Sequence, residues 1–450
     1  MDDIRAIFKA YDIRGKVGSE LTPEVCENIG RIFADWLPKD GPVVVGHDMR
    51  PDSTDLAAAL MRGINTQGRD TWDIGLATSD MVYFAPGEFP ELAGGVMITA
   101  SHNPGEYNGI KFCREGALPV GIESGLAEIR DLVLAGDPPE PAAKQGAVIK
   151  KDLLQTWIDH VLTFVDTKRI KPLRVGVDAG NGMGGLTMPR LAERLPIELH
   201  PLYFELDGSF PNHEANPMKV ETLQDLSDLV VREKLDFGIA FDGDADRFAL
   251  VDEHGTPLTG SMAYALLCEY VLGQHPGATF VHDLRMSRGA LDLIHRQGGK
   301  TVRSKVGNTF IKEVVRKENA EFGGEITGHF MFKENYFVDS GLLAALIAIE
   351  VMSEADFTLS EFVQHTDTYA HRPEINLEAE DKQAVMQKVA ESFKDADIDW
   401  LDGLTVGYPY GWFNLRPSNT EPVMRLNAEA KTREQLDGLI VRVKTAAKEE

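Results

Sequence analysis

Residues 237–247 read FGIAFDGDADR, an apolar run that ends in Asp and continues into an acidic loop. Runs this apolar are typical of strands covered on both faces, as in parallel or mixed sheets with helices packed on them. Three further runs also end in Asp, at residues 43–48, 174–178 and 280–283. A fifth run, residues 96–99, ends in ASHNP. The pattern predicts several buried strands with polar groups at their carboxyl ends.

Amphipathic stretches lie between these strands. Apolar residues recur at helical spacing over residues 153–165 and 223–230, and strands that alternate with helices predict α/β layers. The repeated strand-then-Asp pattern indicates similar units in series. Residues 412–416 and 424–430 instead alternate in period two, and a capping-box sequence at 432–435 opens a helix. The end of the chain therefore predicts a smaller α+β unit.

Length, composition and charge limit the class of protein. The chain has 450 residues, enough for about three domains with room for one more, and its 43% hydrophobic and 26% charged residues are ordinary globular values. With 46 Lys and Arg against 71 Asp and Glu, the net charge is −25. Such a surface repels nucleic acid and anionic membranes, so neither is an expected partner. Phosphorylated small molecules stay possible, because a cluster of positive groups or a metal can invert the local field.

Cysteine content and the N-terminal sequence predict the compartment. Three cysteines without C-x-x-C spacing form neither a disulfide framework nor a zinc ribbon, so a reducing compartment is expected. The acidic first residues lack the apolar core of a signal peptide, and the most apolar stretch, residues 341–352, is too short to span a bilayer. We expect a soluble, cytoplasmic protein.

The acidic loop is the strongest functional signal. Asp242, Asp244 and Asp246 project to one side of an extended segment and converge on one point. So much negative charge needs a cation, and all-oxygen ligation suits Mg²⁺ or Ca²⁺. An EF-hand is excluded, because Arg247 stands where that loop needs Gly and an apolar strand follows. A solvated acidic turn is the structural alternative.

Ser101 follows an apolar strand, at the end where α/β sheets place their ligands. It lacks the G-x-S-x-G of a nucleophile elbow, which argues against an acyl-transferring hydrolase. Its oxygen is instead a candidate to carry a phosphoryl group held by a divalent ion. Lys111 follows a tight Asn108-Gly109 turn, from which it could fold back near Ser101 as a proton carrier or charge clamp. The alternative for this segment is a capped turn.

A third segment, residues 323–329, reads GGEITGH. Glu325, Thr327 and His329 alternate, so in extended form all three point one way, and the glycines permit close approach by a ligand. A carboxylate that accepts from two neighbouring hydroxyls, beside a hydroxyl donor, is suited to hold a sugar. A plain Gly-rich loop is the alternative.

A fourth segment, residues 416–422, reads RPSNTEP and lies between two alternating strands. Arg416 with three polar side chains and the loop N–H groups makes a phosphate cradle without a P-loop lysine motif. A polar hairpin loop is the alternative. Arg14 could be a further positive group, although a lone Arg is most often a surface residue.

Taken together, these segments resemble the α-D-phosphohexomutase family, and most of all its bacterial phosphomannomutase/phosphoglucomutase branch. The motifs follow the family's order from Tyr11 to Thr420. The resemblance implies an α/β fold of three similar mixed-sheet domains and a smaller C-terminal α+β domain around a central cleft. The Pro-rich segment 136–141 suits a domain boundary, and residues 366–373 are a weaker candidate for the last boundary. We expect domains at residues 1–141, 142–251, 252–366 and 367–450.

The resemblance also implies roles for single residues. Ser101 would hold the transferable phosphoryl group, and Asp242, Asp244 and Asp246 would bind Mg²⁺ together with it. Lys111, Arg14 and His329 would assist proton transfer and charge stabilisation. The substrate would contact a larger set, which comprises Tyr11, Arg247, Arg285, Asn308, Glu325, Thr327, His329, Arg416, Ser418, Asn419 and Thr420.

Several positions depart from common family patterns. Thr327 stands where Ser is common, and its added methyl group crowds the sugar pocket. Asn308 stands where some mannose-active relatives have His, and Arg285 where others have Lys. Asn419 is similar to the mannose/glucose branch rather than to glucosamine-type relatives. The pattern favours mannose or glucose without choosing between them.

The implied function is an isomerase, an intramolecular phosphotransferase that interconverts hexose 1-phosphate and hexose 6-phosphate. It would work through phosphoserine 101, Mg²⁺ and a hexose 1,6-bisphosphate that serves as intermediate and activator. The expected partners are phosphosugars, and the expected state is a monomer or dimer. The alternatives are a phosphoglucosamine mutase, a Mg²⁺-dependent sugar phosphatase and a non-catalytic sugar-phosphate sensor.

Overall fold

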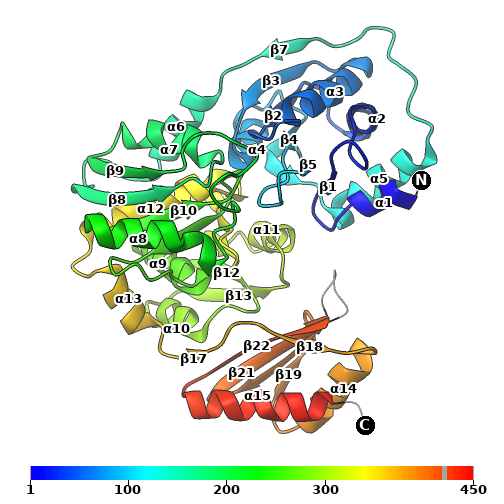
Figure 1. Cartoon of the computed structure of the whole chain (residues 1–450). Helices are drawn as coiled ribbons and strands as arrows, with labels where there is room; N and C mark the ends of the chain where they lie inside the picture. Colours follow the sequence, from blue (N-terminus) through cyan, green and yellow to red (C-terminus); the bar gives the residue numbers. More distant parts are fainter. Residues whose placement is uncertain (1, 418–422, 449–450) are drawn as a thin grey trace.

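The computed structural model describes residues 2–417 and 423–448, which form four separate sheets with their own helices (Figure 1). We name these sheets, with the helices around them, domains I to IV in chain order. In Figure 1 domain IV lies at the bottom, below domain III and apart from domain I. This is the predicted order of three mixed α/β units and a smaller α+β unit.

Domain I is built on a seven-stranded mixed sheet. Its strands are β1 (Ile13–Lys16), β2 (Val43–His47), β3 (Thr71–Leu76), β4 (Gly94–Ile98), β5 (Tyr107–Arg114), β6 (Leu118–Pro119) and β7 (Val148–Lys150). Its helices are α1 (Asp2–Ile7), α2 (Pro23–Trp36), α3 (Ser53–Thr66), α4 (Ser79–Glu88) and α5 (Leu126–Ala135), with the short 3-10 helices η1 (Glu115–Ala117) and η2 (Ile122–Ser124). The strand order is β1-β5-β4-β2-β3-β7, with β6 paired to β5.

Parallel pairing in domain I brings the carboxyl ends of its central strands together. β2 runs parallel to β3 and β4, whereas β5 runs antiparallel to β4 and β1. The edge strand β7 pairs with β3, so this sheet extends past residue 141. The predicted domain boundaries all stay predictions.

Domain II has a four-stranded sheet in the order β11-β10-β8-β9. The elements are β8 (Leu173–Asp178), β9 (Ile197–Leu202), β10 (Phe237–Phe241), β11 (Phe248–Val251), α6 (Leu154–Leu162), α7 (Gly184–Ala192), η3 (Val220–Leu223) and α8 (Gln224–Glu233). β8 runs parallel to β9 and β10, and β11 returns antiparallel to β10. The acidic loop therefore lies in the β10–β11 turn, at the carboxyl end of β10.

Domain III has a five-stranded sheet in the order β13-β12-β14-β15-β16. Its strands are β12 (Thr279–Asp283), β13 (Lys300–Ser304), β14 (Phe322–Gly324), β15 (Phe330–Phe332) and β16 (Val338–Asp339). Its helices are α9 (Gly260–Gln274), α10 (Arg288–Arg296), α11 (Asn308–Lys317), η4 (Lys333–Asn335), α12 (Gly341–Glu354) and α13 (Leu359–Thr366). The first three strands are parallel, and β15 and β16 are antiparallel additions.

Domain IV has an antiparallel sheet in the order β17-β22-β21-β20-β19, with β18 paired to β22. The elements are β17 (Ala370–His371), β18 (Ile375–Glu378), α14 (Lys382–Ser392), β19 (Asp397–Asp399), β20 (Leu404–Tyr408), β21 (Gly411–Pro417), β22 (Val423–Ala430) and α15 (Arg433–Ala447). Both helices pack on the sheet and on each other, around a core of their own that contains Phe393 and Phe413.

The most apolar stretch of the chain forms a central helix. Residues 341–352 lie in α12, whose side chains from Leu342 to Ile349 are buried on every side of the helix. The helix packs against α6, α7 and α9 and joins the apolar cores of domains II and III. Among the described residues, no helix is both long enough and apolar enough to cross a membrane.

We expect Gly63→Ala to destabilise the protein by about 1–3 kcal/mol, because α2 and α3 cross at glycines. A Cβ at Gly63 would lie 2.0 Å from the carbonyl oxygen of Glu27, and one at Gly30 2.2 Å from that of Leu60. The matched control is Gly438→Ala in the exposed face of α15, where a Cβ meets nothing within 4 Å. The control should stabilise by up to about 1 kcal/mol. Thermal unfolding of both variants checks the pair, and equal shifts would contradict the close crossing.

Candidate active site

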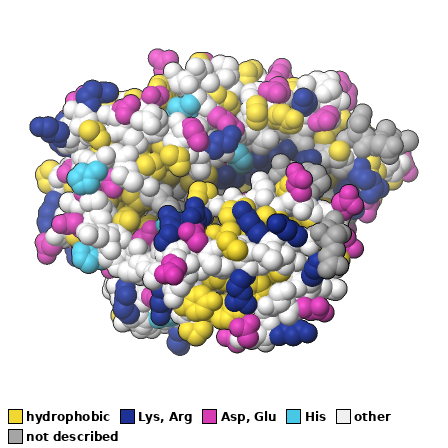
Figure 2. Space-filling view, turned by 60° about the horizontal axis from the view of Figure 1, so that its bottom comes forward, with side chains coloured by type: hydrophobic (Ala, Val, Ile, Leu, Met, Phe, Trp, Pro, Cys, Tyr) yellow, Lys and Arg dark blue, Asp and Glu magenta, His cyan; other side chains and the backbone are white. Residues whose placement is uncertain are grey.

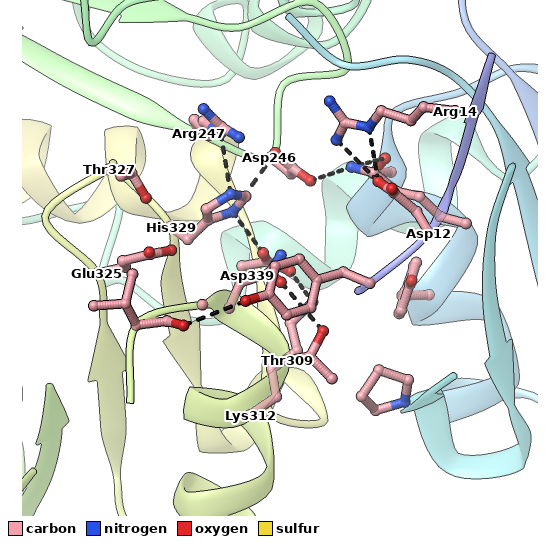
Figure 3. A pocket seen from close by; sticks show the side chains of 18 residues that line it. Asp12, Arg14, Asp246, Arg247, Thr309, Lys312, Glu325, Thr327, His329 and Asp339 are labelled. Atoms are coloured by element: carbon pink, nitrogen blue, oxygen red, sulfur yellow. Dashed lines mark hydrogen bonds and ion pairs between the residues drawn. The ribbon is translucent and has the colours of Figure 1, made fainter. Parts of the chain in front are cut away.

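A cavity of about 200 Å³ lies where domains I, II and III meet, and it is lined by predicted site residues from all three (Figure 3). Those residues are Tyr11, Arg14, Lys111, Asp246, Arg247, Asn308, Glu325, Thr327 and His329. Figure 2 shows a hollow across one face of the molecule with Lys and Arg side chains beside it. Positive groups therefore gather locally, although the whole chain is acidic.

The three aspartates of the acidic loop converge as predicted. Oxygen atoms of Asp242, Asp244 and Asp246 all lie within 4.8 Å of one another, and all three side chains are buried. Asp244 Oδ1 and Asp246 Oδ1 have no hydrogen-bond partner among the described residues. Burial, and then the charges of Asp244 and Asp246, raise the pKa of Asp242 well above its usual value. The solvated-turn alternative is excluded.

Lys111 is the positive charge closest to these carboxylates. Its Nζ lies 2.6 Å from Asp244 Oδ2 and 2.6 Å from Asp246 Oδ2. Burial alone would lower the pKa of Lys111, but the two carboxylates raise it well above its usual value. Burial would likewise raise the pKa of Asp244, but Lys111 lowers it. Lys111 therefore neutralises part of the negative charge of the acidic loop.

Ser101 lies against the acidic loop and is 1% exposed. Its Oγ donates a hydrogen bond of 2.7 Å to Asp242 Oδ2, and its backbone adopts a φ of 51°. His102 Nδ1 lies 3.1 Å from Ser101 Oγ, and the charge of Arg247, followed by burial, holds the pKa of His102 well below its usual value. The hydroxyl predicted to carry a phosphoryl group is therefore beside the predicted metal ligands.

Arg14 joins the Ser101 loop to the cavity. Its guanidinium pairs with Asp12 at 2.9 Å and donates a bond of 2.5 Å to the Oδ1 of Asn103. β1 and β5 are paired, so Arg14 lies opposite Gly109 and close to the strand that carries Lys111. The surface-residue alternative for Arg14 is wrong, because a folded sheet edge places it over the serine loop.

The predicted sugar-binding side chains line the opposite wall of the cavity. Glu325 follows β14, and its Oε1 lies 3.1 Å from Nη2 of Arg285. Burial alone would lower the pKa of Arg285, but the charges of Asp283 and Glu325 raise it. Thr327 Oγ1 is buried and has no hydrogen-bond partner within the part of the chain that the structure describes. Glu325 and Thr327 thus provide an acceptor and a free hydroxyl.

His329 connects the sugar-binding segment to the acidic loop (Figure 3). Its Nδ1 lies 2.7 Å from Asp339 Oδ2, and its Nε2 accepts a hydrogen bond of 3.0 Å from Arg247. Lys312 pairs with Asp339 at 2.6 Å on the other side. Burial would raise the pKa of Asp339, but Lys312 and His329 lower it. The imidazole is therefore held at both nitrogens.

Of the remaining predicted residues, some line the cavity, one lies away from it, and three lie outside the described residues. Tyr11 donates a 3.3 Å hydrogen bond to the carbonyl oxygen of Val306, and burial, followed by the charges of Glu325 and Asp402, raises its pKa to about 12. Asn308 opens α11 at the cavity wall. Arg416 is the second-last residue of β21 and does not line the cavity, and Ser418, Asn419 and Thr420 lie outside the described residues.

Sequence reasoning missed several residues that line the cavity, among them Asp339, Ser79 and Lys312. Asp339 is the last residue of β16, so the strand-then-Asp pattern could have found it. Ser79 and Lys312 carried no such signal, because the first donates to Asp244 Oδ2 across 165 residues of chain and the second lies in an ordinary helical pattern. Only the fold brings these side chains to the cavity.

Four protein-family models match the chain in sequence order. They describe the alpha/beta/alpha domain I, II and III and the C-terminal domain of phosphoglucomutase/phosphomannomutase, and they match residues 5–139, 155–255, 259–369 and 374–446. The chain belongs to this family. That result confirms the resemblance, the four-domain fold and the expected class of enzyme, an isomerase that transfers a phosphoryl group within its substrate.

Relatives of this phosphohexomutase chain cover almost its whole length. It is 39% identical over 429 residues to "Phosphohexose mutases" of Xanthomonas campestris pv. campestris, which covers 94% of this chain and 95% of that one. It is 38% identical over 435 residues to the "Phosphomannomutase" of Escherichia coli (strain K12), with 94% of each chain covered. A crystal structure of a family protein from Burkholderia thailandensis has a TM-score of 0.90 at 29% identity, covering 98% of this chain and 97% of that one.

The donor set of the acidic loop fits Mg²⁺. Three buried carboxylates supply only oxygen atoms, and two of those oxygens lack a hydrogen-bond partner among the described residues. Hard oxygen ligands suit Mg²⁺, and an uncompensated group of buried charges is costly. Lys111 compensates part of the charge, so a divalent ion would complete the neutralisation.

We expect MgCl₂ to raise the unfolding temperature of the protein and EDTA to reverse the shift. An ion at 100 times its dissociation constant stabilises the folded state by about 2.7 kcal/mol. Asp244→Asn should abolish the shift. The control is Asp252→Asn, a buried aspartate that follows β11 at the opposite end of the sheet. A full Mg²⁺ shift in Asp244→Asn would contradict the assignment.

Proposed function

We propose that this enzyme is a phosphomannomutase/phosphoglucomutase that interconverts hexose 1-phosphate and hexose 6-phosphate. The observation that supports it most is the 2.7 Å hydrogen bond from Ser101 Oγ to Asp242, inside a buried group of three carboxylates. The names of the relatives at 38–39% identity point to the same reaction. Ser101 would carry the phosphoryl group between the two positions of the sugar.

In the proposed transfer, an oxygen of a sugar hydroxyl attacks the phosphorus on Ser101. The new phosphorus–oxygen bond forms as the bond to Ser101 Oγ breaks, the hydroxyl gives up its proton, and Ser101 Oγ takes one up. His329, Lys111 or Arg14 would assist the proton transfer, since all three side chains line the cavity. Arg14 and Lys111 would stabilise the negative charge of the phosphoryl group.

Asp242, Asp244 and Asp246 would hold Mg²⁺, which, when bound, supplies positive charge to the phosphoryl group. The cluster of buried carboxylates with unpaired oxygens supports this ligand set. Arg247 would support the phosphoryl group or the substrate, since it lies between the acidic loop and His329, 3.6 Å from Asp242.

The intermediate would be a hexose 1,6-bisphosphate, which must turn around before it returns a phosphoryl group to Ser101. One set of sugar contacts must therefore serve both orientations: Glu325 and Thr327 for hydroxyls, with Tyr11, Asn308 and Arg285 around them. The second phosphate would bind Arg416 with Ser418, Asn419 and Thr420. Free bisphosphate would act as an activator, because it restores the phosphoserine.

Location and assembly are part of the same proposal. We propose a cytoplasmic enzyme, monomeric or dimeric, whose partners are phosphosugars. Three buried, unpaired cysteines, Cys26, Cys113 and Cys268, suit a reducing compartment. Experiments with each sugar phosphate decide whether the preferred substrate contains mannose or glucose, and glucosamine is the third sugar to test.

The direct test is incubation with mannose 1-phosphate or glucose 1-phosphate, MgCl₂ and a trace of glucose 1,6-bisphosphate, followed by ³¹P NMR. We expect the hexose 6-phosphate signal to grow. Ser101→Ala should lower the rate by at least about 10³-fold, because the phosphoryl carrier is lost. Ser227→Ala, a buried serine on α8 outside the cavity, should keep full activity.

Other products would select an alternative. Inorganic phosphate as the main product, with an active Ser101→Ala variant, would make the protein a phosphatase. Turnover of glucosamine 1-phosphate alone would make it a phosphoglucosamine mutase. Binding of these sugars without turnover, once Ser101 is phosphorylated, would indicate a sensor.

A further inference from the structure

The loop that carries Ser101 is held by one buried guanidinium. Arg50 follows β2 and is 3% exposed. It donates hydrogen bonds to four backbone carbonyl oxygens of the loop, those of Ser101 at 2.9 Å, Asn103 at 2.6 Å, Pro104 at 2.8 Å and Tyr107 at 2.8 Å. The planar guanidinium thus fixes both ends of the serine loop at once.

The guanidinium is itself held in one orientation. Asp48 Oδ2 lies 3.2 Å from Arg50 Nε, and Asp48 Oδ1 accepts bonds from the Arg50 backbone N–H and from Ser53 Oγ. Ser53 Oγ in turn accepts from Asn108 Nδ2 on β5. Because Asp48 is fully buried and paired, the carboxylate and the guanidinium support each other through charge and geometry.

Domain II covers the other side of this clamp. The guanidinium carbon of Arg50 lies 5.1 Å from the centre of the Phe210 ring. A Cβ at Gly208 would lie 2.5 Å from the Cα of Arg50, and one at Gly243 would lie 2.4 Å from the carbonyl oxygen of Ser101. Domain II also supplies Asp242. The clamp therefore sets the serine loop against the domain that carries the metal ligands.

Ser101 needs such a restraint. Its φ of 51° is in the left-handed region, which costs a residue with a side chain about 1–2 kcal/mol. Strained backbone persists only where the surroundings fix it. The Arg50 bond to the carbonyl oxygen of Ser101 and the bond from its N–H to Thr99 Oγ1 are two such contacts.

We propose that Arg50 is a positioning residue for phosphoryl transfer, which acts through the serine loop and does not touch the substrate. It keeps Ser101 Oγ against Asp242 while the phosphoryl group leaves and returns. This inference rests on the proposed role of Ser101. Loss of the Arg50 guanidinium should lower kcat, because Ser101 Oγ is no longer held in place. It should leave KM for the sugar phosphate nearly unchanged, because other residues make the sugar contacts.

A matched residue, Arg69, distinguishes a positioning role of Arg50 in catalysis from a purely structural one. Arg69 also donates to four backbone carbonyl oxygens in domain I, those of Ala34, Leu37, Lys39 and Gly41. These carbonyls lie outside the serine loop and the cavity. Loss of the Arg69 guanidinium therefore removes the same kind of bonds without touching the site.

The experiment compares Arg50→Met, Arg50→Lys and Arg69→Met in the full-length protein by steady-state kinetics with the better hexose 1-phosphate and by thermal unfolding. We expect kcat to fall about 100-fold in Arg50→Met and about 10-fold in Arg50→Lys, with KM within about twofold of wild type. The rate at which glucose 1,6-bisphosphate phosphorylates Ser101 should fall in parallel. Arg69→Met should lower the unfolding temperature and keep kcat within about twofold.

Unchanged kcat in either Arg50 variant, or an equal loss in Arg69→Met, would overturn the proposal. Arg50→Lys keeps the charge and most of the volume, so it decides the question if Arg50→Met does not fold. If the wild-type enzyme itself shows no mutase turnover, the proposed function fails instead, and that outcome is distinct from the first two.

Discussion

The burial of three carboxylates beside one hydroxyl is the constraint on which the rest of the structure depends. Asp242, Asp244 and Asp246 repel one another, and burial alone disfavours the charged forms of Asp242 and Asp244. The fold meets part of this cost with Lys111, which lies 2.6 Å from two of them. Asp244 Oδ1 and Asp246 Oδ1, which have no hydrogen-bond partner among the described residues, suit a divalent ion. A cation bound there would supply positive charge to a phosphoryl group on Ser101.

Sheet topology explains how the site is assembled. Ser101 follows β4, Asp242 follows β10 and Glu325 follows β14, and each of these strands pairs in parallel with a neighbour in its own domain. The carboxyl ends of parallel strands are where α/β sheets place their ligands. Side chains from domains I, II and III line one cavity, so the predicted site residues come from three different domains. Domain IV is built on its own core and an antiparallel sheet.

Much of this arrangement could be predicted from the sequence, because the strand-then-Asp pattern and the spacing of the acidic loop are local. Side chains that act over long separations could not. Ser79 and Asp244 are 165 residues apart, and nothing in the sequence around Ser79 marks it as a partner of Asp244. Arg50 follows an apolar run like many surface arginines, and only the folded serine loop gives it four carbonyl partners. The predicted domain boundaries stay predictions, and β7, which follows the Pro-rich segment, pairs with β3 of domain I.

The central claim is that Ser101 carries a transferable phosphoryl group beside the acidic loop. The most direct measurement is the intact mass of the protein before and after incubation with glucose 1,6-bisphosphate and MgCl₂, with the modified peptide sequenced. The account predicts the gain of one phosphoryl group on Ser101, and its loss when excess hexose 1-phosphate is added. No gain in mass, or a phosphoryl group on another residue, would contradict it.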